Sequence, residues 1–527
     1  MHLSRLIGAA LTASVLAAPA PAAPPPDLDA FVAQAMQTFG PPGMSVAIVE
    51  GGKPVLAKGY GIRRLGDPAP VDAHTIFPIG SETKAFTAAA LAILVDQGKL
   101  KWDDRVVDKL PGFQMYDPYA TTHMTVRDLL THRSGLGLGE GDLLIVPATT
   151  RSRADIVHAL RYLKPATGFR EGFAYDNILY IVAGALVEAV SGETWQHFVQ
   201  THILTPAGMA DAATAYDPNA ANGIALHGRT DGAIRGLGPL RILPRGLDDK
   251  TAGPAGGVNA SATDMAAWMQ TQLSAGLAPN GTRIFSETQA KEMWTPIVVV
   301  ADSPVPVVPG SPVAAALSPA FQDYGLGWFI ENYHGHTVIE HTGAVLGAVA
   351  ALYLIPEKKV GIAVMINSED GAARRAVAFH LLDHYLGLPD QHWNETFKAM
   401  IDAMNANAQK AMQAPAAPST KATGDAPSLP LASYAGIYRD PWYGTATVSM
   451  RGGRLRLRFD MTPDMEAPLV PAGRNTFRAD WTDRTIEAAY VEFVLDKGRI
   501  ASVKMRPVSP LADFSFDYKD LAFVPER

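Results

Sequence analysis

The sequence predicts a mixed α/β (α+β) fold, in which helices flank an antiparallel sheet and also form a helical lobe, followed by a small all-β, barrel-like domain. Strand patterns occur at both ends of residues 28–400, with helical spacing between them. A second group of hairpins follows a segment rich in Ala, Pro and Ser. This order builds one sheet from the two ends of the first domain and leaves its middle as a helical lobe.

Composition indicates a globular chain with more than one domain. It has 527 residues, of which 47% are hydrophobic, enough for sizeable cores. The formal net charge of -7, without a local block of Lys and Arg, argues against nucleic acid as a partner. Cysteine is absent, which excludes disulfides, a cysteine nucleophile and thiolate metal ligands.

The N-terminus has the pattern of a secretory signal peptide over residues 1–23. Arg5 precedes an apolar stretch, Leu6–Ala17, and small residues near Ala22 suit a cleavage site. The apolar stretch is shorter than the roughly 20 residues that a bilayer span needs. We therefore expect a periplasmic or secreted protein with no membrane span after signal cleavage.

The first predicted elements are a hairpin and a helix. Met44–Glu50 and Pro54–Tyr60 flank Gly51-Gly52, a typical hairpin turn. A helix from Ser81 to about Gly98 follows. Helical spacing then predicts the lobe and one later helix: Thr125–Thr131, Ser152–Tyr162, Asn177–Val190, Thr194–Leu204 and Asp264–Leu273.

The second half of the domain returns to strands and ends in a helix. The predicted elements are Thr337–His341, Ala348–Leu354, a turn at Pro356–Lys359, Gly361–Met365 and the helix Ala373–Leu386. We place the catalytic domain at residues 28–400.

Residues 404–430 have few large apolar side chains, and we predict a linker there. Residues 431–527 then form the all-β domain, with hairpins built from Thr445–Met450 with Leu455–Phe459 and from Val491–Leu495 with Ile500–Met505.

Ser81 and Lys84 are the first candidate site residues. Side chains three apart lie on one face of a helix, so the Ser81 hydroxyl and the Lys84 amine can meet. The helix N-terminus and burial would both lower the pKa of Lys84 and favour the neutral amine that a general base must be. Taken alone, a capping serine followed by an exposed lysine explains the pair at least as well.

Two further motifs favour a catalytic site that includes Ser81 and Lys84. Tyr175-Asp176-Asn177 precedes an apolar helix, and His341-Thr342-Gly343 ends a predicted strand with Ala344 next in the chain. Each has an ordinary structural interpretation, a core tyrosine, a structural histidine or a bulge glycine. There is no Gly-x-Ser-x-Gly around Ser81, so an α/β-hydrolase elbow is not indicated.

Together the three motifs resemble the penicillin-binding-protein and serine β-lactamase superfamily, in its class C and D-aminopeptidase or D-alanyl-D-alanine carboxypeptidase-like branch. The resemblance covers roughly residues 28–390, and the final domain resembles the lipocalin-like barrels of some members. Other family-like stretches are Thr125–Leu136, Phe173–Gly192, Ala252–Met265 and Tyr324–Trp328.

The resemblance implies a role for each residue. Ser81 would be the acylated nucleophile, with Lys84 and Tyr175 sharing proton transfer, and which of the two is the base stays open. Asn177 would orient Lys84 and a substrate amide. In the family, the backbone N–H groups that correspond to Ser81 and Ala344 form an oxyanion hole. His341 and Thr342, on the strand edge that carries Gly343, would contact a substrate carboxylate or Tyr175. No metal or cofactor is implied.

His341 stands where class C β-lactamases usually have lysine, and histidine is largely uncharged at neutral pH. We therefore expect an exported serine peptidase or amidase acting on small peptides, some containing D-residues. A carboxylesterase or a β-lactamase on the same fold, and a non-enzymatic penicillin-binding sensor, are the alternatives. The expected partners are small peptide, amide or ester substrates, and a homo-oligomer stays open. The barrel could cover the cleft, limit substrate length, mediate oligomers or only stabilise the chain.

Overall fold

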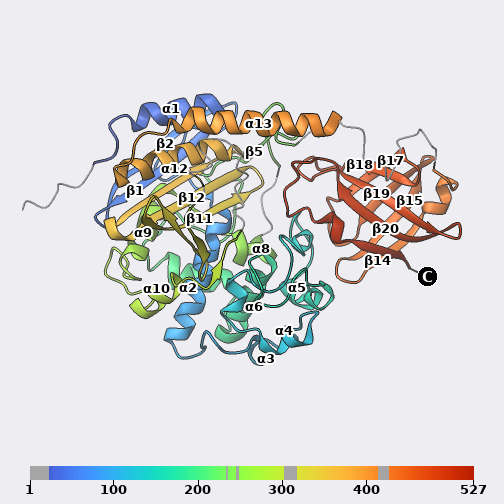
Figure 1. The fold of residues 1–527 in the computed structure, drawn as a ribbon, viewed down its shortest axis with the longest axis horizontal. Coiled ribbons are helices and arrows are strands. Elements are labelled where there is room, and N and C mark those ends of the chain that lie inside the picture. The colour runs from blue at the N-terminus through green and yellow to red at the C-terminus, as the bar shows by residue number, and fades with distance from the viewer. Residues whose placement is uncertain are drawn as a thin grey trace, which may run out of the picture.

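The structure, a computed structural model, describes residues 23–232, 235–244, 249–301, 317, 319–413 and 427–526. The predicted signal peptide, apart from Ala23, lies outside these residues. Figure 1 shows two bodies, a larger one with a sheet covered by helices and a smaller closed barrel beside the helical lobe. This architecture confirms the predicted fold class.

The larger body is built on a nine-stranded antiparallel sheet in the order β3-β2-β1-β13-β12-β11-β10-β9-β8. At its centre β1 (Gly43–Glu50) pairs with β13 (Val360–Ile366), with Ala47 opposite Ala363. The two ends of the domain therefore meet in one sheet, as predicted. The other strands are β2 Lys53–Arg64, β3 Asp67–Pro70, β8 Val298–Val299, β9 Gln322–Tyr324, β10 Phe329–Tyr333, β11 His336–Val345 and β12 Ala348–Ile355.

The central strands of the sheet are buried on both faces, as the continuous burial of β1 and β13 shows. Met44, Val46 and Ile48 pack toward a core shared with α1 (Leu28–Phe39) and α12 (Gly371–Leu386). Ala47 and Val49 point the other way, into the core shared with the helical lobe. In Figure 1, α1, α12 and α13 (Trp393–Gln413) cover the upper face of the sheet.

The helical lobe packs around α2 (Thr83–Asp96), which is buried from Thr83 to Leu94 and therefore forms the core of the domain. The remaining helices are α3 Val106–Lys109, α4 Pro118–His123, α5 Arg153–Ala159, α6 Ile178–Ser191, α7 Trp195–Val199, α8 Asp249–Gly256, α9 Ala262–Leu273 and α10 Glu287–Met293.

Short elements complete the domain. The tight helical turns are η1 Gly80–Glu82, η2 Asp128–Leu130, η3 Asp142–Leu144, η4 Leu160–Tyr162 and η6 Pro356–Lys358. The segment η5, Gln200–Leu204, is a π-helical turn that follows α7 directly. Two small ribbons pair β4 (Phe77–Pro78) with β7 (Asn259–Ala260) and β5 (His227–Gly228) with β6 (Arg241–Ile242).

One predicted helix, Thr125–Thr131, is only the turn η2 at Asp128–Leu130. The Asp128 carboxylate accepts hydrogen bonds from the backbone N–H and the hydroxyl of Thr125. This local side-chain bonding competes with a regular helix.

The C-terminal domain is a closed barrel of eight strands, which confirms the predicted all-β module. Phe459, Phe477 and Phe493 are buried in its interior. The elements of the domain are β14 Gly436–Asp440, β15 Gly444–Arg451, β16 Arg454–Phe459, β17 Glu466–Gly473, β18 Thr476–Ala479, β19 Ala489–Asp496, β20 Arg499–Pro507, β21 Ala522–Pro525, η7 Leu431–Tyr434 and η8 Tyr518–Asp520.

The predicted linker begins too early. Helix α13 continues to Gln413 and so occupies the first part of residues 404–430. Ala408 is buried on this helix, although its neighbours in sequence are mostly small or polar. Residues 414–426 lie outside the described part of the chain.

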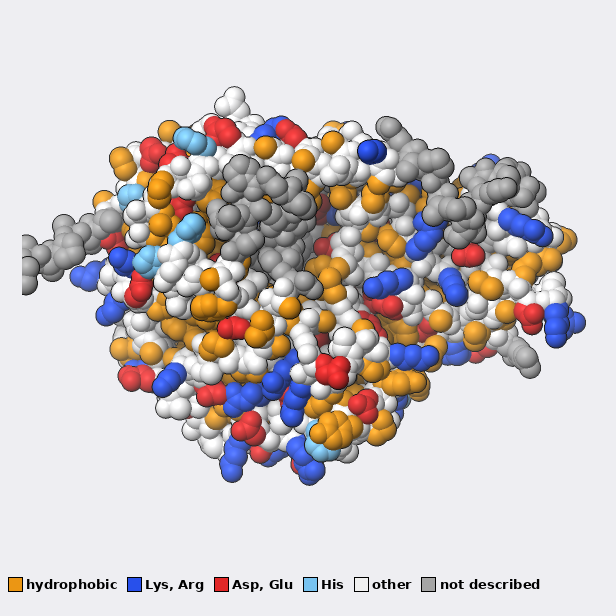
Figure 2. Space-filling model, in the orientation of Figure 1, with side chains coloured by type: hydrophobic (Ala, Val, Ile, Leu, Met, Phe, Trp, Pro, Cys, Tyr) orange, Lys and Arg blue, Asp and Glu red, His pale blue; other side chains and the backbone are white. Residues whose placement is uncertain are grey.

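Among the described residues, no single helix is long and apolar enough to span a membrane, although the bent pair Ile178–Ser191 and Trp195–Leu204 passes that test jointly. Figure 2 shows acidic and basic side chains interspersed over the face that it draws.

Candidate active site

Ser81 lies in the tight turn η1, immediately before α2. The turn is held against β11 by two glycines, because a Cβ on Gly80 would come within 2.6 Å of the Ala344 nitrogen and one on Gly343 within 3.0 Å of the Ser81 nitrogen. Gly80 also has a φ of 54°, which disfavours other residues. The backbones of Ser81 and Ala344 therefore come together, as an oxyanion hole from their N–H groups would need.

Lys84 lies in the first turn of α2 and is completely buried. Its Nζ donates to Ser81 Oγ at 3.0 Å, to Asn177 Oδ1 at 2.7 Å and to the Ala255 carbonyl at 3.1 Å. Burial lowers the pKa of Lys84 to about 7, while the carboxylates of Asp142 and Asp176 act in the opposite direction. A substantial fraction of Lys84 is therefore neutral at physiological pH.

Tyr175 lies beside the same amine, with Lys84 Nζ 4.8 Å from its ring centroid. Burial raises the pKa of Tyr175 well above its ordinary value, and an interaction with Ser81 opposes that rise only in part. The His132 ring packs at 4.2 Å from the Tyr175 ring, and His132 Nδ1 accepts the backbone N–H of Asp176. Tyr175 is thus a protonated group held in contact range of Ser81 and Lys84.

His341 lies on β11 with its ring 6.3 Å from the Tyr175 ring. Its side chain is 1% exposed, and it contacts the Tyr324 hydroxyl at 3.1 Å and the Thr342 carbonyl at 2.7 Å. Burial and the Lys84 charge lower the pKa of His341 to about 3, so the ring is neutral. The His341 ring therefore supplies no positive charge to a substrate. Ala344, three residues later, is exposed.

A cavity of about 470 Å³ opens beside Ser81. Its walls are largely apolar, and the cation that the described lining residues supply, Arg235, is paired with Glu369 at 2.5 Å. The C-terminal barrel contributes part of the wall, namely Leu511, Asp513, Ser515 and Phe516. The barrel therefore borders the cavity beside Ser81.

Two parts of the site escaped sequence reasoning. Asp142 accepts from Asn177 Nδ2 at 2.8 Å, so it fixes the amide that contacts Lys84. Asp176 accepts the Ser134 hydroxyl at 3.2 Å and the Leu179 N–H at 3.2 Å, which anchors the start of α6. Asp176 lies between two residues that the sequence did indicate, but the sequence carries no local signal for Asp142.

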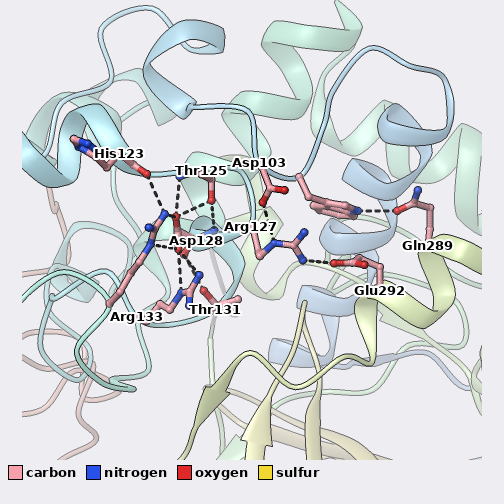
Figure 3. A network of polar contacts seen from close by, with 11 residues as sticks. Asp103, His123, Thr125, Arg127, Asp128, Thr131, Arg133, Gln289 and Glu292 are labelled. Carbon is pink, nitrogen blue, oxygen red and sulfur yellow. Dashed lines mark hydrogen bonds and ion pairs between the residues drawn. The ribbon is translucent and has the colours of Figure 1, made fainter.

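Hydrogen bonds to Asp128 fix the segment of chain that packs against Tyr175. Asp128 is completely buried and accepts hydrogen bonds from Thr125 and from Arg133 Nε at 3.0 Å, as Figure 3 shows. Arg170 binds the same carboxylate at 3.0 and 2.5 Å. The network fixes the segment that carries His132, which packs on Tyr175.

Comparison with known proteins now decides the family. The β-lactamase sequence model matches residues 28–387, which is most of the chain and includes every strand of the nine-stranded sheet around Ser81. The chain belongs to the β-lactamase family. Members of this family are serine hydrolases, and this β-lactamase-family chain adds at residues 420–525 a domain of unknown function, DUF3471.

Known relatives match this chain over different shares of its length. Unguisins hydrolase ungD of Aspergillus violaceofuscus is 29% identical over 439 residues, 79% of this chain and 75% of its own. Penicillin-binding protein 4 of Amycolatopsis lactamdurans is 28% identical over 62% of this chain and 81% of its own. The octameric penicillin-binding protein homologue of Pyrococcus abyssi shares the fold of this β-lactamase-family chain, with a TM-score of 0.57, 22% identity and coverage of 94% and 99% of the two chains.

Proposed function

We propose that the protein is an exported serine hydrolase that cleaves amide or peptide bonds of small peptides through an acyl-enzyme at Ser81. The observation that carries the proposal is the buried Lys84 amine, with a pKa of about 7, at 3.0 Å from Ser81 Oγ beside a 470 Å³ cavity. A nucleophile and a base in hydrogen-bond contact are the requirement for an activated serine.

In the proposed reaction, neutral Lys84 takes the Ser81 proton as Oγ attacks the carbonyl carbon, and the N–H groups of Ser81 and Ala344 bind the oxyanion. Tyr175, protonated at neutral pH, donates a proton to the leaving nitrogen and recovers one from Lys84. Water then attacks the ester carbonyl of the acyl-enzyme, which releases the acid and restores Ser81. The raised pKa of Tyr175 favours Lys84 as the base.

A carboxylesterase is a second candidate. The cavity walls are largely apolar, His341 is neutral and buried, and Arg235 is already paired with Glu369, so no unpaired cation among the described lining residues awaits a substrate carboxylate. The same observation argues against efficient turnover of β-lactam antibiotics, which carry such a carboxylate.

The test compares the wild type with Ser81→Ala on a panel of D- and L-peptides, peptide amides, esters and β-lactams. Turnover of peptides or amides by the wild type alone supports the proposal, and D-substrates would define its stereochemistry. Turnover of esters but of no peptide or amide would replace the proposal with the esterase. Export is tested separately by the loss of residues 1–23 from the mature protein. Assembly into oligomers, as in the archaeal homologue, is tested by light scattering.

A further inference from the structure

A loop of the C-terminal barrel contacts the back of the catalytic site. Residues 508–517 connect β20 to η8, and within this loop Ser515 is 8% exposed and Asp517 2% exposed. Their partners are not in the barrel. They belong to the η3 turn of the catalytic domain, more than 370 residues earlier in the chain.

Both polar side chains hold that turn. The Asp517 carboxylate accepts the backbone N–H of Gly141 at 2.8 Å and of Leu143 at 3.2 Å. The Ser515 hydroxyl donates to Asp142 Oδ2 at 2.8 Å. These hydrogen bonds are shielded from water, and in such surroundings a hydrogen bond is electrostatically stronger than in solution.

The same Asp142 oxygen continues the contact to the catalytic lysine. It accepts Asn177 Nδ2 at 2.8 Å, and Asn177 Oδ1 accepts Lys84 Nζ at 2.7 Å, one hydrogen bond away from Ser81 Oγ. An amide has one donor end and one acceptor end, so the carboxylate fixes which end of Asn177 faces Lys84. The loop and the nucleophile are thus joined by an unbroken series of hydrogen bonds.

Apolar contacts align the loop on the same elements. The Phe514 ring lies 6.1 Å from the Tyr175 ring at 77°. A Cβ on Gly139 would come within 2.6 Å of the Phe514 ring, so Gly139 permits the close approach, and its N–H binds the Tyr175 carbonyl at 2.9 Å. Neighbouring loop residues therefore contact Tyr175 and Asp142 at once.

We propose that the C-terminal barrel is part of the catalytic apparatus, and that Ser515 is a positioning residue which, through Asp142, holds Asn177 against Lys84. The inference rests on the proposed role of Lys84 and Ser81. It assigns the barrel a role in the chemical step in addition to its place in the cavity wall.

The charges around Asp142 fix the sign of the effect. Lys84 faces it from α2, Asp176 from the start of α6, and Asp513 and Asp517 from the barrel loop. Burial raises the pKa of Asp142 to about 6, and the Ser515 hydrogen bond opposes that rise. Without Ser515 the pKa of Asp142 rises further, its charge at Lys84 diminishes, and the pKa of Lys84 falls.

The experiment uses the full-length chain with p-nitrophenyl acetate as probe and Ser81→Ala as blank. Ser515→Ala should lower kcat/KM at its plateau roughly tenfold, mainly in kcat, because an oriented partner of the base is lost. The acidic limb of its pH profile, where kcat/KM falls as Lys84 takes up a proton, should move to lower pH. Ser515→Thr keeps a hydroxyl, so it should retain most of kcat/KM and the pH profile of the wild type.

Two matched controls separate positioning from folding. Ser509→Ala removes a hydroxyl of the same loop that accepts only the local Leu511 N–H among the described contacts. Thr150→Ala removes a hydroxyl that reaches the barrel at the Met461 carbonyl, away from Lys84. Both should keep the wild-type rate and pH profile.

Crystal structures of the wild type and Ser515→Ala give a readout independent of turnover. We expect the Asn177 amide to leave Lys84 in the variant. A wild type that releases no more p-nitrophenol than Ser81→Ala would show that this ester does not acylate Ser81, and the structures would then judge the positioning role alone. A Ser515→Ala variant with unchanged Asn177 geometry, or with wild-type rate and pH profile, would overturn the inference.

Discussion

A Cβ atom on Gly343 would lie 1.7 Å from the carbonyl oxygen of Ile79. Strand β11 therefore meets the turn that carries Ser81 backbone to backbone, with no room for a side chain between them. This contact sets the spacing of the Ser81 and Ala344 N–H groups. It explains in physical terms why the third motif has glycine after His341-Thr342.

Replacing this glycine should cost activity more than stability. In Gly343→Ala the strand must move from Ile79, which displaces the Ala344 N–H from the oxyanion position. Loss of one such donor is worth about 3 kcal/mol, or roughly a hundredfold in kcat. Steady-state kinetics on the best substrate measure it. The control is Gly371→Ala, where an added Cβ meets nothing within 4 Å. Equal activity of the two variants would contradict the backbone contact.

The rate should depend on pH through Lys84. Because the neutral amine is the base, kcat/KM should rise with pH through about 7, the pKa to which burial lowers Lys84. The Asp142 charge opposes this lowering, so Asp142→Asn should shift the acidic limb to lower pH. The control is Glu140→Gln, which removes a carboxyl two residues away whose pKa burial raises to about 7. A limb that stays in place in Asp142→Asn would show that another group controls it.

The sequence predicted the parts of the site that are local in the chain. Ser81 and Lys84 are three residues apart, and Tyr175 and Asn177 are two apart, so one turn of backbone determines each pair. The pairing of β1 with β13 also followed, because apolar strands at both ends of a domain need partners. For these features, local pattern and global fold agree.

The remaining parts depend on contacts that no local pattern encodes. Ser515 and Asp142 are 373 residues apart, and each is an ordinary polar residue in a loop until the barrel docks. The burial of His341 against Tyr324 likewise depends on β9 and β11 lying in one sheet with β10 between them. Helix α13 was mistaken in part for a linker because small and polar residues dominate its C-terminal half.

The stabilising contribution of the hydrogen bonds to Asp128 should be larger at neutral pH than at acidic pH. Burial raises the pKa of Asp128, but hydrogen bonds from Arg170 and Thr125 outweigh it and leave a net lowering. Asp128→Ala removes the buried partner of Arg133 and Arg170 and should cost about 3 kcal/mol in the free energy of unfolding. A carboxyl with a lowered folded-state pKa stabilises above its unfolded pKa of 3.8, and this stabilisation is lost as pH falls through the folded value.

Thermal unfolding from pH 3 to pH 8 checks this. The difference in Tm between wild type and Asp128→Ala should be largest near neutrality and shrink below about pH 4. Asp103→Ala is the control, since that side chain is 80% exposed and pairs with Arg127 at 3.3 Å. It should change Tm little. A deficit in Asp128→Ala that is independent of pH would show that packing, not the ionised carboxylate, stabilises the turn.

Glu82, between Ser81 and Thr83, should destabilise the protein as pH rises. Its side chain is 3% exposed, and neither carboxyl oxygen has a hydrogen-bond partner among the described residues. Burial raises its pKa well above the ordinary 4.5, so the folded protein keeps the proton. Above pH 4.5 the unfolded chain releases that proton, and each further pH unit costs the folded state about 1.4 kcal/mol until its own pKa is reached.

Glu82→Gln stays neutral in both states and should escape this penalty. Its Tm should match the wild type at pH 4 and exceed it increasingly as pH rises toward the folded-state pKa of Glu82, because only the wild type loses stability through this carboxyl. Glu492→Gln, at an exposed position of the barrel, should show no such trend. A Tm difference for Glu82→Gln that does not grow with pH would mean that Glu82 carries the same charge in the folded and unfolded chains.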